Sequence, residues 1–555
     1  MSIRRRTLAA PAIALLALAS SAVGVLNQFT YDDKYIILLN PATRSLHAWW
    51  LAFSSSYWPK EWGGDGYRPL TILAFKIESS IGGGAPMAFH AANILLYAAV
   101  SLLVFALARR VLPHWAAWVA AAVFAVHPVH VEAVANVVGQ SELLVAIALL
   151  SATILYVRDR QKGALEPWTI VAIAALYALG CFAKEHAIVL PGVLGAAELT
   201  IVDDRTPLRE RIRRLRPTYL LLVAIAVAFV GVRALALADH GIGGFQPFTP
   251  FAALHISTRD RILTALGVVP QWVRLLFWPA HLSSEYGPAD IEIAQGFSIS
   301  QFPGFALLVA ILGLGHLLRR RQPVIGFGIA LACVALLPSS NFIVPAGIVL
   351  AERTLFLPSV GAALIVGALA VIAANMVRAR GADRPGVRGA AQAAFAGLLV
   401  LGAYRSEQRS TVWRDNDTLF RRAVIDAPLS YRAHYMLGAW HFENGRKRDG
   451  EVEYRKALHL FPYDPFLSYR MAEQYRHFGL CAPALPLYRW TRSLDPQFPL
   501  GRTAFAICLL DQGDYDEAKA AALEAMRHGG DIEFLRRLVF IADSAKSADG
   551  RAKAN

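Results

Sequence analysis

Charged side chains are scarce in this sequence. Asp, Glu, Lys and Arg make up 17% of its 555 residues, whereas apolar residues make up 55%. So small a charged fraction excludes an ordinary water-soluble enzyme. The sequence also lacks a basic stripe of the kind that binds DNA, so we expect no nucleic-acid partner despite the net charge of +14. The composition instead predicts an all-α protein that crosses a membrane many times.

Long apolar runs fill most of residues 1–405, which we interpret as a transmembrane domain. A helix needs roughly 20 mostly apolar residues to cross the hydrocarbon layer. We expect about eleven spans, near residues 8–27, 88–108, 115–127, 139–157, 168–183, 186–200, 218–238, 302–318, 323–340, 355–376 and 389–404. The first run also resembles a secretory signal peptide. We expect it to be retained as an anchor, because the loop that follows it needs a packed helix beneath it.

The basic residues predict the orientation of these spans, because Lys and Arg collect in short cytoplasmic loops. The basic clusters fall on alternate loops, at Arg4 to Arg6, Arg109 and Arg110, 158–162, 205–216, Arg319 to Arg321, and Arg378 to Arg388. This pattern places the N terminus in the cytoplasm and, after an odd number of spans, the C terminus outside. The segment 262–282 would then be a re-entrant or interfacial helix pair, since one more full span would turn the C-terminal part inward.

The chain changes character after Tyr404, where an internal repeat begins. Similar residues recur every 34 positions, as in Pro428, Pro462 and Pro496, in Phe420, Tyr454 and Tyr488, and in the small residues Gly450, Ala484 and Ala518. This spacing predicts an α-solenoid of tetratricopeptide repeats. We expect about three repeats plus a leading half over 406–545, followed by a disordered tail over 546–555. Such a solenoid typically holds an extended peptide, and the alternative is a capping or dimerisation module.

Only four cysteines are present. Cys181 and Cys333 lie in apolar runs, where cysteine usually acts as a packing residue. Cys481 and Cys508 belong to the repeat region, and an oxidising compartment outside the cell could join them. Sequence spacing alone does not establish such a bond.

The loops predicted to face outward carry unusual polar groups. Asp32 and Asp33 directly follow the first span, and Arg68 ends the stretch SYWPKEWGGDGYR. The aromatic residues of that stretch, Trp58, Trp62 and Tyr67, are typical of an interfacial helix. Later outward loops contribute His127, His130, Glu132, Lys184, Glu185, Glu352 and Arg353. Taken singly, such charges are often solvated caps or cations that reach lipid headgroups, but their convergence on one side favours a site.

Outward carboxylates and cations beside a bilayer suit the transfer of a sugar from a polyprenyl phosphate. A carboxylate takes the proton of the acceptor hydroxyl, and Asp32 and Asp33 are the candidates for this base. Cations neutralise the departing phosphate as charge builds on it. We expect Arg353 and Lys184, and more weakly Arg68, to bind that phosphate. Direct displacement assisted by one base would invert the anomeric centre.

Five further residues are expected to support this site: His127, His130, Glu132, Glu185 and Glu352. The first three have the side chains of a metal site, but their spacing fits no standard zinc pattern, so we expect no metal there. The sequence leaves open whether a divalent cation or another cofactor is needed. The two aspartates have an alternative role in keeping the first loop outside, although acidic residues contribute little to orientation.

Six segments in a fixed order, followed by the repeats, carry a resemblance to a known family. They are FTYDDKYIILLN, GYRPLTILAFKIE, AFHAANILLYAAV, HPVHVEAVANVVGQSELL, CFAKEHAIVLPGVL and NFIVPAGIVLAERTLFLPSVG. The chain thereby resembles, over nearly its whole length, the transmembrane and tetratricopeptide-repeat-containing O-mannosyltransferases and their bacterial relatives. The resemblance implies a GT-C glycosyltransferase fold, a lipid-phosphate sugar donor and an essential acidic motif in the first outward loop, which falls here on Asp32 and its neighbour Asp33.

The chain departs from that family in its modest central segment, 239–301, and in its small number of repeats, which leaves the acceptor open. Its Ala- and Arg-rich composition suggests a bacterial inner membrane, with periplasmic repeats and undecaprenyl phosphate as the lipid carrier. We expect transfer of a sugar, mannose being one candidate, to a protein Ser or Thr hydroxyl. Two alternatives stay open: a non-catalytic scaffold whose repeats bind exported proteins, and a related enzyme that modifies a glycolipid or cell-wall glycan.

Overall fold

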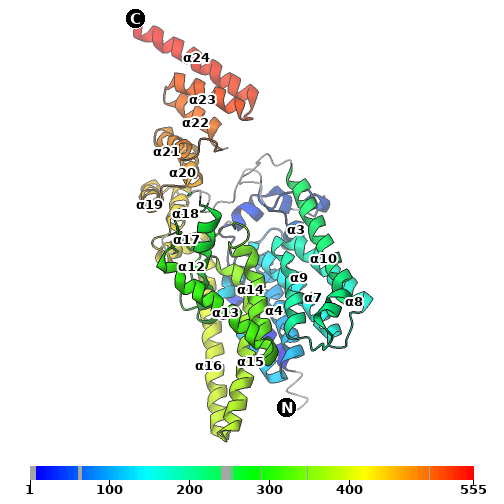
Figure 1. Ribbon diagram of the computed structural model, residues 1–555. Coiled ribbons are helices and arrows are strands. Elements are labelled where there is room, and N and C mark those ends of the chain that lie inside the picture. The colour runs from blue at the N-terminus through cyan, green and yellow to red at the C-terminus, as the bar shows by residue number, and fades with distance from the viewer. Residues whose placement is uncertain are drawn as a thin grey trace. The chain divides into compact units, whose positions relative to one another are not determined.

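The computed structural model describes residues 8–44, 46–59, 66–238, 251, 254, 256–288, 291–346, 348–498 and 500–554. All the regular elements in these ranges are helices, as the sequence predicts (Figure 1). The chain divides into two compact units. The first unit comprises 1–245, 259–284 and 294–422, and the second comprises 246–258, 285–293 and 423–555. The second unit therefore begins later than position 406 and also draws two short segments from the middle of the chain.

In the first unit, helices lie where the sequence predicts spans. They are α2 (Ala9–Ala19), α4 (Pro86–Val111), α5 (His114–Ala125), α7 (Gln140–Arg160), α8 (Pro167–Ala183), α9 (Leu190–Thr200), α10 (Leu208–Leu237), α13 (Phe302–Arg321), α14 (Pro323–Leu336), α15 (Pro358–Ala379) and α16 (Pro385–Ser410). Within the described residues, six helical stretches are long and apolar enough to cross a membrane, and a seventh is added if the bent pair His114–Ala125 and Pro128–Ala135 is one span. The prediction of a multi-pass membrane protein is confirmed, while the number eleven stays a prediction.

Proline marks the start of many of these helices. It occupies the first turn of α4, α8, α13, α14, α15 and α16. Proline is suited to this position because its fixed φ is helical and its missing N–H would have no partner inside the helix. The position of proline in the sequence therefore indicates where each of these helices begins.

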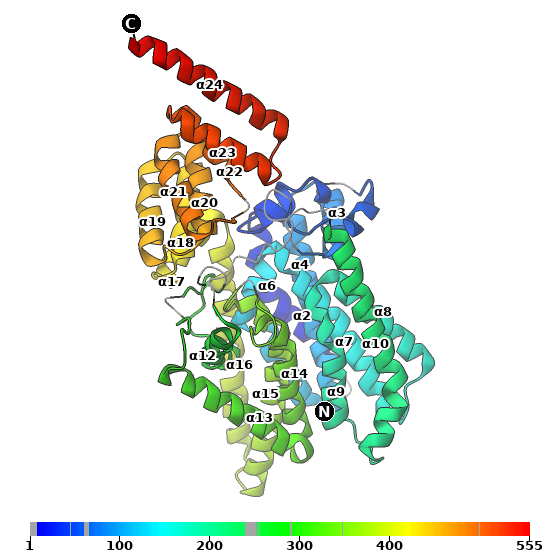
Figure 2. The same cartoon turned by 45° about the horizontal axis from the view of Figure 1, so that its top comes forward.

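The loops predicted to face outward meet at one end of the bundle. Thr71 Oγ1, on α3 (Pro69–Gly82), donates to Ala183 O at the end of α8 at 2.8 Å. His127 Nε2 lies 3.1 Å from the carbonyl oxygen of Leu276, on α12 (Thr258–Phe277). Helix α12 covers most of the segment 262–282. Figure 2 shows the first loop, in dark blue, at the end of the bundle away from the N terminus.

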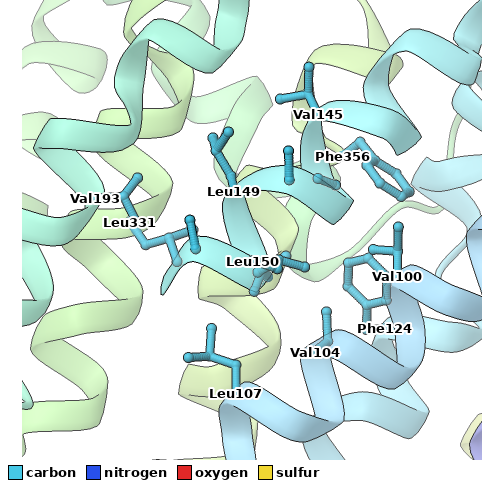
Figure 3. Packing of buried hydrophobic residues seen from close by; sticks show 14 of the residues in the cluster. Val100, Val104, Leu107, Phe124, Val145, Leu149, Leu150, Val193, Leu331 and Phe356 are labelled. Atoms are coloured by element: carbon cyan, nitrogen blue, oxygen red, sulfur yellow. The ribbon is translucent and has the colours of Figure 1, made fainter. Parts of the chain in front are cut away.

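The core of the first unit forms where α4, α5 and α7 meet. Val100, Val104 and Phe124 are almost completely buried there, beside Leu149 and Leu150 of α7 (Figure 3). Their aliphatic and aromatic side chains interdigitate between the helices, and α9 and α14 add to the same cluster through Val193 and Leu331. Such packing drives helix association where lipid surrounds the bundle.

Helices α14 and α15 approach each other closely through two glycines. A Cβ built on Gly328 would lie 2.6 Å from the carbonyl oxygen of Gly361, and a Cβ on Gly361 would lie 2.2 Å from that of Gly328. No larger residue fits at either position without moving a backbone. Small residues at helix crossings are typical of membrane proteins, because they let two backbones come into contact.

An ion network joins α7, α9 and α10 at the end of the bundle that carries the basic clusters. Arg160 and Arg211 each contact Glu198 Oε1 at 2.8 Å, and Asp204 is a second partner of Arg160. Tyr156 donates its hydroxyl proton to Glu198 at 2.8 Å. The buried carboxylate is thus surrounded by donors, which is the condition for burying a charge at low cost.

The second unit consists of paired helices. They are α18 (Tyr431–Glu443) with α19 (Lys447–Leu460), α20 (Pro465–His477) with α21 (Cys481–Leu494), and α22 (Arg502–Asp511) with α23 (Tyr515–Arg527). Gly438 and Gly450 face each other where the first pair crosses, since an added Cβ on either glycine would lie 3.1 or 3.0 Å from the carbonyl oxygen of the other. A last helix, α24 (Ile532–Ala554), continues through most of the segment 546–555 that we expected to be a disordered tail.

A disulfide joins two helices of the second unit. Cys481 lies at the start of α21 and Cys508 in α22, with their Cα atoms 5.0 Å apart. Cys181 and Cys333 are free, and Cys181 is buried. The bridge closes a sequence separation of 27 residues. A disulfide stabilises a fold largely by restricting the unfolded chain.

Replacing both Cys481 and Cys508 with Ser should lower the free energy of unfolding of the second unit by roughly 3 kcal/mol, the value expected for a loop of this length. Thermal unfolding of the full chain in detergent, with and without dithiothreitol, measures the effect. Reduction should bring the wild type to the midpoint of the double variant and leave that variant unchanged. Equal midpoints for oxidised wild type and variant would contradict a stabilising role, and the Cys181→Ser variant serves as control.

Candidate active site

The two candidate carboxylates lie in a tight turn just beyond the first helix. Before the turn, the Gln28 N–H donates to the carbonyl oxygen of Arg414 at 2.8 Å. Tyr31 then adopts a φ of 55°, which side chains with a Cβ rarely do. Its N–H donates to Asn416 Oδ1 at 2.8 Å. These contacts hold the turn so that the next two residues enter different surroundings.

Asp33 is fully buried and bonds to two loops. Its carboxylate accepts hydrogen bonds from the N–H groups of Thr30 at 3.1 Å, Val137 at 3.3 Å and Val138 at 2.9 Å. Burial raises the pKa of the Asp33 carboxyl to about 7, although these three N–H groups oppose the rise. With both oxygens occupied by backbone donors, Asp33 fastens the first loop to the loop before α7.

Asp32 differs from its neighbour because part of its surface stays accessible. Its negative charge acts on Arg353, whose pKa rises above the ordinary value because the Glu132 and Asp32 carboxylates outweigh the opposing effect of burial. Asp32 therefore lies within electrostatic reach of a cation that comes from a loop more than three hundred residues further along the chain. Of the two predicted bases, only Asp32 keeps accessible surface.

Arg353 forms an ion pair with the buried carboxylate of Glu132. The Arg353 guanidinium contacts Glu132 Oε1. The backbone N–H of Arg353 donates to Glu132 Oε2 at 2.9 Å. Glu132 is 2% exposed, whereas the Arg353 side chain keeps 22% of its surface accessible. Glu132 thus holds η12 (Glu352–Leu355), the short helix just before α15, against α6 (Val131–Ala135). Part of the Arg353 side chain stays accessible.

Arg68 pairs with Glu185 through two hydrogen bonds. Arg68 Nε lies 3.1 Å from Glu185 Oε2, and Arg68 Nη2 lies 2.7 Å from Glu185 Oε1. This bidentate geometry is the strong form of an arginine–carboxylate contact. The Glu185 charge raises the pKa of Arg68 against the effect of burial. The Arg68 guanidinium also lies 4.5 Å from the centre of the Tyr57 ring.

Lys184 lies beside that pair and has a carboxylate of its own. Its Nζ is 2.5 Å from Glu142 Oε1, and His186 Nδ1 lies 3.6 Å from the other oxygen of Glu142. The side chains of Lys184 and Glu142 are 8% and 6% exposed. Burial lowers the pKa of Lys184, while the Glu142 carboxylate opposes this. The ammonium is the least accessible of the three predicted phosphate ligands.

Tyr57 connects the two groups of charges. It is 1% exposed, and burial raises the pKa of its hydroxyl, with Arg68 opposing and Asp32 and Asp33 adding to the rise. The Arg68 group and the aspartate turn are therefore close enough to act on one side chain. Sequence reasoning missed Tyr57, because it stands in an aromatic stretch that was interpreted as interfacial.

That interpretation does not hold for Tyr67, which is 1% exposed and donates its hydroxyl proton to the carbonyl oxygen of Phe53 at 2.8 Å. The stretch turns inward here, so part of its aromatic content belongs to the core. Trp58 is half-buried. Trp62 lies outside the described residues.

The remaining predicted residues tie the loops together. His130 is 2% exposed, with Nδ1 at 2.9 Å from the Tyr97 hydroxyl and Nε2 at 2.7 Å from Ser359 Oγ. Glu352 is also buried and accepts from the Ser283 N–H at 2.6 Å. Among the described residues, no group of three or more His, Cys, Asp and Glu is arranged to hold a metal ion. His130 and Glu352 thus contact neighbouring loops, and their role in supporting the site stays a prediction.

The comparisons with known proteins point to one family. Residues 69–232 match the family model described as dolichyl-phosphate-mannose-protein mannosyltransferase. The chain is 25% identical to protein O-mannosyl-transferase TMTC3 of Mus musculus over 85% of its own length and 53% of the relative's. For TMTC1 and TMTC4 of Homo sapiens the identities are 26% and 27%, over 82% and 77% of this chain and 55% and 62% of the relatives. No solved structure matches.

These matches confirm the resemblance to the transmembrane and tetratricopeptide-repeat O-mannosyltransferases. The chain spans about half the length of the first relatives it matches. The matched family model begins at Pro69, so it does not include Asp32 and Asp33.

The free energy of unfolding should depend on pH through the titration of Asp33. Because burial raises its pKa from 3.8 to about 7, the folded chain binds this proton more tightly than the unfolded chain between those values. The stability that Asp33 contributes is complete below about pH 4. It should be lost as the pH rises to about 7, by roughly 4 kcal/mol at about 1.4 kcal/mol per pKa unit.

Thermal unfolding of the solubilised protein between pH 5 and pH 8 tests this expectation. The midpoint of the wild type should fall more steeply with rising pH than that of Asp33→Asn, which cannot titrate. Asp383→Asn, which removes a partly accessible partner of the exposed Arg388, should keep the wild-type slope. Equal slopes for wild type and Asp33→Asn would show that Asp33 does not titrate in this range.

Proposed function

We propose that this chain, a relative of the protein O-mannosyl-transferases, is a membrane glycosyltransferase that moves a sugar from a polyprenyl-phosphate donor to a protein Ser or Thr hydroxyl. One observation carries the proposal. Asp32 keeps accessible surface in the field of Arg353, while the adjacent Asp33 is fully buried and fastens the loop. A base that keeps accessible surface, sits in a hydrogen-bonded turn and lies within the field of a cation is what transfer from a phosphate requires.

In the proposed reaction, Asp32 accepts the proton of the acceptor hydroxyl. The hydroxyl oxygen forms a bond to the anomeric carbon as the bond between that carbon and the phosphate oxygen breaks. The electron pair of the broken bond stays with the phosphate, so the polyprenyl phosphate leaves with one more negative charge. Because the acceptor attacks from the face opposite the leaving group, the anomeric centre inverts. Binding both substrates beside the bilayer supplies the positioning.

The departing phosphate needs positive charge close by. Arg353 and Arg68 suit this role best, because 22% and 17% of their side-chain surfaces are accessible while their carboxylate partners hold them in place. Lys184 is less accessible and contributes through its charge and through its pair with Glu142. An arginine can keep one carboxylate contact and still offer further N–H donors to a phosphate oxygen.

The proposal includes an orientation. The loops with Asp32, Arg68 and Arg353 face the periplasm of a bacterial inner membrane, and the basic clusters at the other ends of the spans face the cytoplasm. With the expected eleven spans, the proposal assigns the second unit to the periplasm as well. The Cys481–Cys508 bridge supports an oxidising compartment for that unit. Its paired helices, spaced by 34 residues, are then tetratricopeptide repeats that present an acceptor peptide.

Asp32→Asn should abolish sugar transfer and leave the protein folded. The amide keeps the shape of the side chain but accepts no proton, and loss of a general base costs typically 10²- to 10⁴-fold in rate. Transfer of radiolabelled sugar from a polyprenyl phosphate to cell-envelope protein, in proteoliposomes, measures the effect. Asp383→Asn should transfer at the wild-type rate.

Wild-type turnover by Asp32→Asn would show that Asp32 is not the catalytic base. Label that appears in lipid or glycan fractions of wild-type membranes instead of protein would identify a different acceptor. Binding of exported peptides with no transfer from any polyprenyl donor would favour the scaffold.

Arg353→Gln should raise the KM for the donor about tenfold, or about 1.4 kcal/mol, and change the KM for the acceptor little. The single variant leaves Glu132 buried without its cation, so Arg353→Gln combined with Glu132→Gln is the better-folded companion. Initial rates at varied donor and acceptor concentrations give both constants. Equal changes in the two constants would argue against placing the donor phosphate at Arg353.

A further inference from the structure

Behind the aspartate turn, several buried polar atoms have no protein partner. Among the described residues, this is true of Thr30 Oγ1, His90 Nδ1, Asn93 Oδ1 and both side-chain polar atoms of Asn136. Each of the four residues is at most 1% exposed. Buried polar groups in native proteins nearly always have a partner, since leaving one without a hydrogen bond is costly. Five such atoms therefore need an explanation.

The residues that carry these atoms come from three neighbouring segments of the first unit, which hydrogen bonds connect. His90 and Asn93 are three residues apart on α4, so they share a face of that helix. His90 Nε2 lies 3.4 Å from the carbonyl oxygen of Gln28, which is two residues before Thr30 in the first loop. Asn93 Nδ2 donates to the carbonyl oxygens of Val134, Asn136 and Val137 at 3.2 to 3.3 Å.

The same two loops meet at Asp33. Its carboxylate bonds the N–H of Thr30 on one side and the N–H of Val137 on the other. Thr30 itself bonds Asp33, and Asn136 directly precedes Val137. His90 and Asn93 on α4 bond to the same two loops. The unpartnered atoms therefore belong to residues that adjoin the contact fixing the candidate catalytic turn. We call this set, Thr30, His90, Asn93 and Asn136, the polar layer.

The mixture of atom types in the polar layer identifies its ligand. Asn136 leaves both a donor, Nδ2, and an acceptor, Oδ1, without a partner. A cation would satisfy the acceptor oxygens but would repel the amide N–H groups. Water donates and accepts at once, and a buried water typically makes about three hydrogen bonds to such groups. The ligand class is therefore water.

We propose that ordered water molecules occupy the polar layer and that Asn136, through them, is a positioning residue for Asp32. The waters join α4 to the two loops that Asp33 connects, so they help to hold the aspartate turn in one conformation. This second half rests on the function proposed above. Asn136 does not touch either substrate, and its effect reaches the reaction only by holding the loop that carries the base.

The first test locates the water. Radiolytic hydroxyl-radical labelling of the full chain in nanodiscs, read by mass spectrometry, modifies buried side chains where water is bound beside them. His90 should be labelled at least fivefold faster than expected from its burial, whereas Phe75, fully buried in an apolar cluster of the same region, should stay unlabelled. Labelling of His90 as low as that of Phe75 would overturn the proposal.

A variant pair strengthens this test. Asn136→Leu has nearly the same size and removes both unpartnered atoms, so labelling at His90 should fall. Asn27→Leu removes a buried Asn whose Nδ2 donates to the carbonyl oxygen of Ser410 at 3.2 Å, and it should leave that labelling unchanged. If the layer were dry, Asn136→Leu would raise the thermal midpoint, because two unsatisfied groups would be gone. We expect the midpoint to fall, and a rise would overturn the proposal.

The positioning role is tested by kinetics. Asn136→Leu should lower kcat about tenfold with less than a twofold change in the KM of the donor, and Asn136→Ser, which keeps a polar group and leaves room for one more water, should recover most of the rate. Unchanged kcat in Asn136→Leu would overturn the positioning role. Absence of transfer by the wild type would overturn the proposed function instead, because labelling and thermal midpoints do not depend on activity.

Discussion

The burial of the Asp33 carboxylate is the constraint on which the candidate site depends. A carboxylate removed from water must be surrounded by hydrogen-bond donors, and Asp33 finds three backbone N–H groups on two different loops. Those donors can converge only if the first outward loop and the loop before α7 take one fixed arrangement. The backbone of the adjacent Asp32 is fixed by the same arrangement, although Asp32 itself is not fully buried. One residue of the pair thus provides rigidity, and the other stays accessible for chemistry.

The same logic governs the cations of the site. Arg353, Arg68 and Lys184 are each matched by a carboxylate from another part of the chain. The pairs keep the charges ionised in a poorly solvated place and connect η12, α3 and the end of α8 to their neighbours. In the proposed function, the donor phosphate shares these cations with Glu132 or Glu185. The proposal therefore couples substrate binding energetically to the arrangement of the loops, with the more accessible arginines as the points of contact.

Much of the fold follows from local sequence, whereas the site does not. Apolar runs and first-turn prolines such as Pro86 and Pro358 specify where helices lie, because each acts within a few residues. The grouping of Asp32, Lys184 and Arg353 at one end of the bundle could be inferred from the alternation of basic loops, and their outward orientation stays a prediction. Their partners could not be inferred, since the pairing of Arg353 with Glu132 spans 221 residues and depends on how the helices pack. Tyr57 and Asn136 carry no pattern at all, and only the packing gives them their place.

The second unit contains pieces of chain from between α10 and α13. Leu254 packs against its core, and Glu285 lies 3.4 Å from Arg432. Gly287 comes so close to Ser430 that an added Cβ would sit 3.2 Å from the Ser430 Cα. The second unit is consequently not a simple C-terminal domain that could be replaced at one boundary in the sequence. A graft of repeats from one homologue onto another must bring the matching central loop with it, so the two stretches of gene are expected to co-diverge.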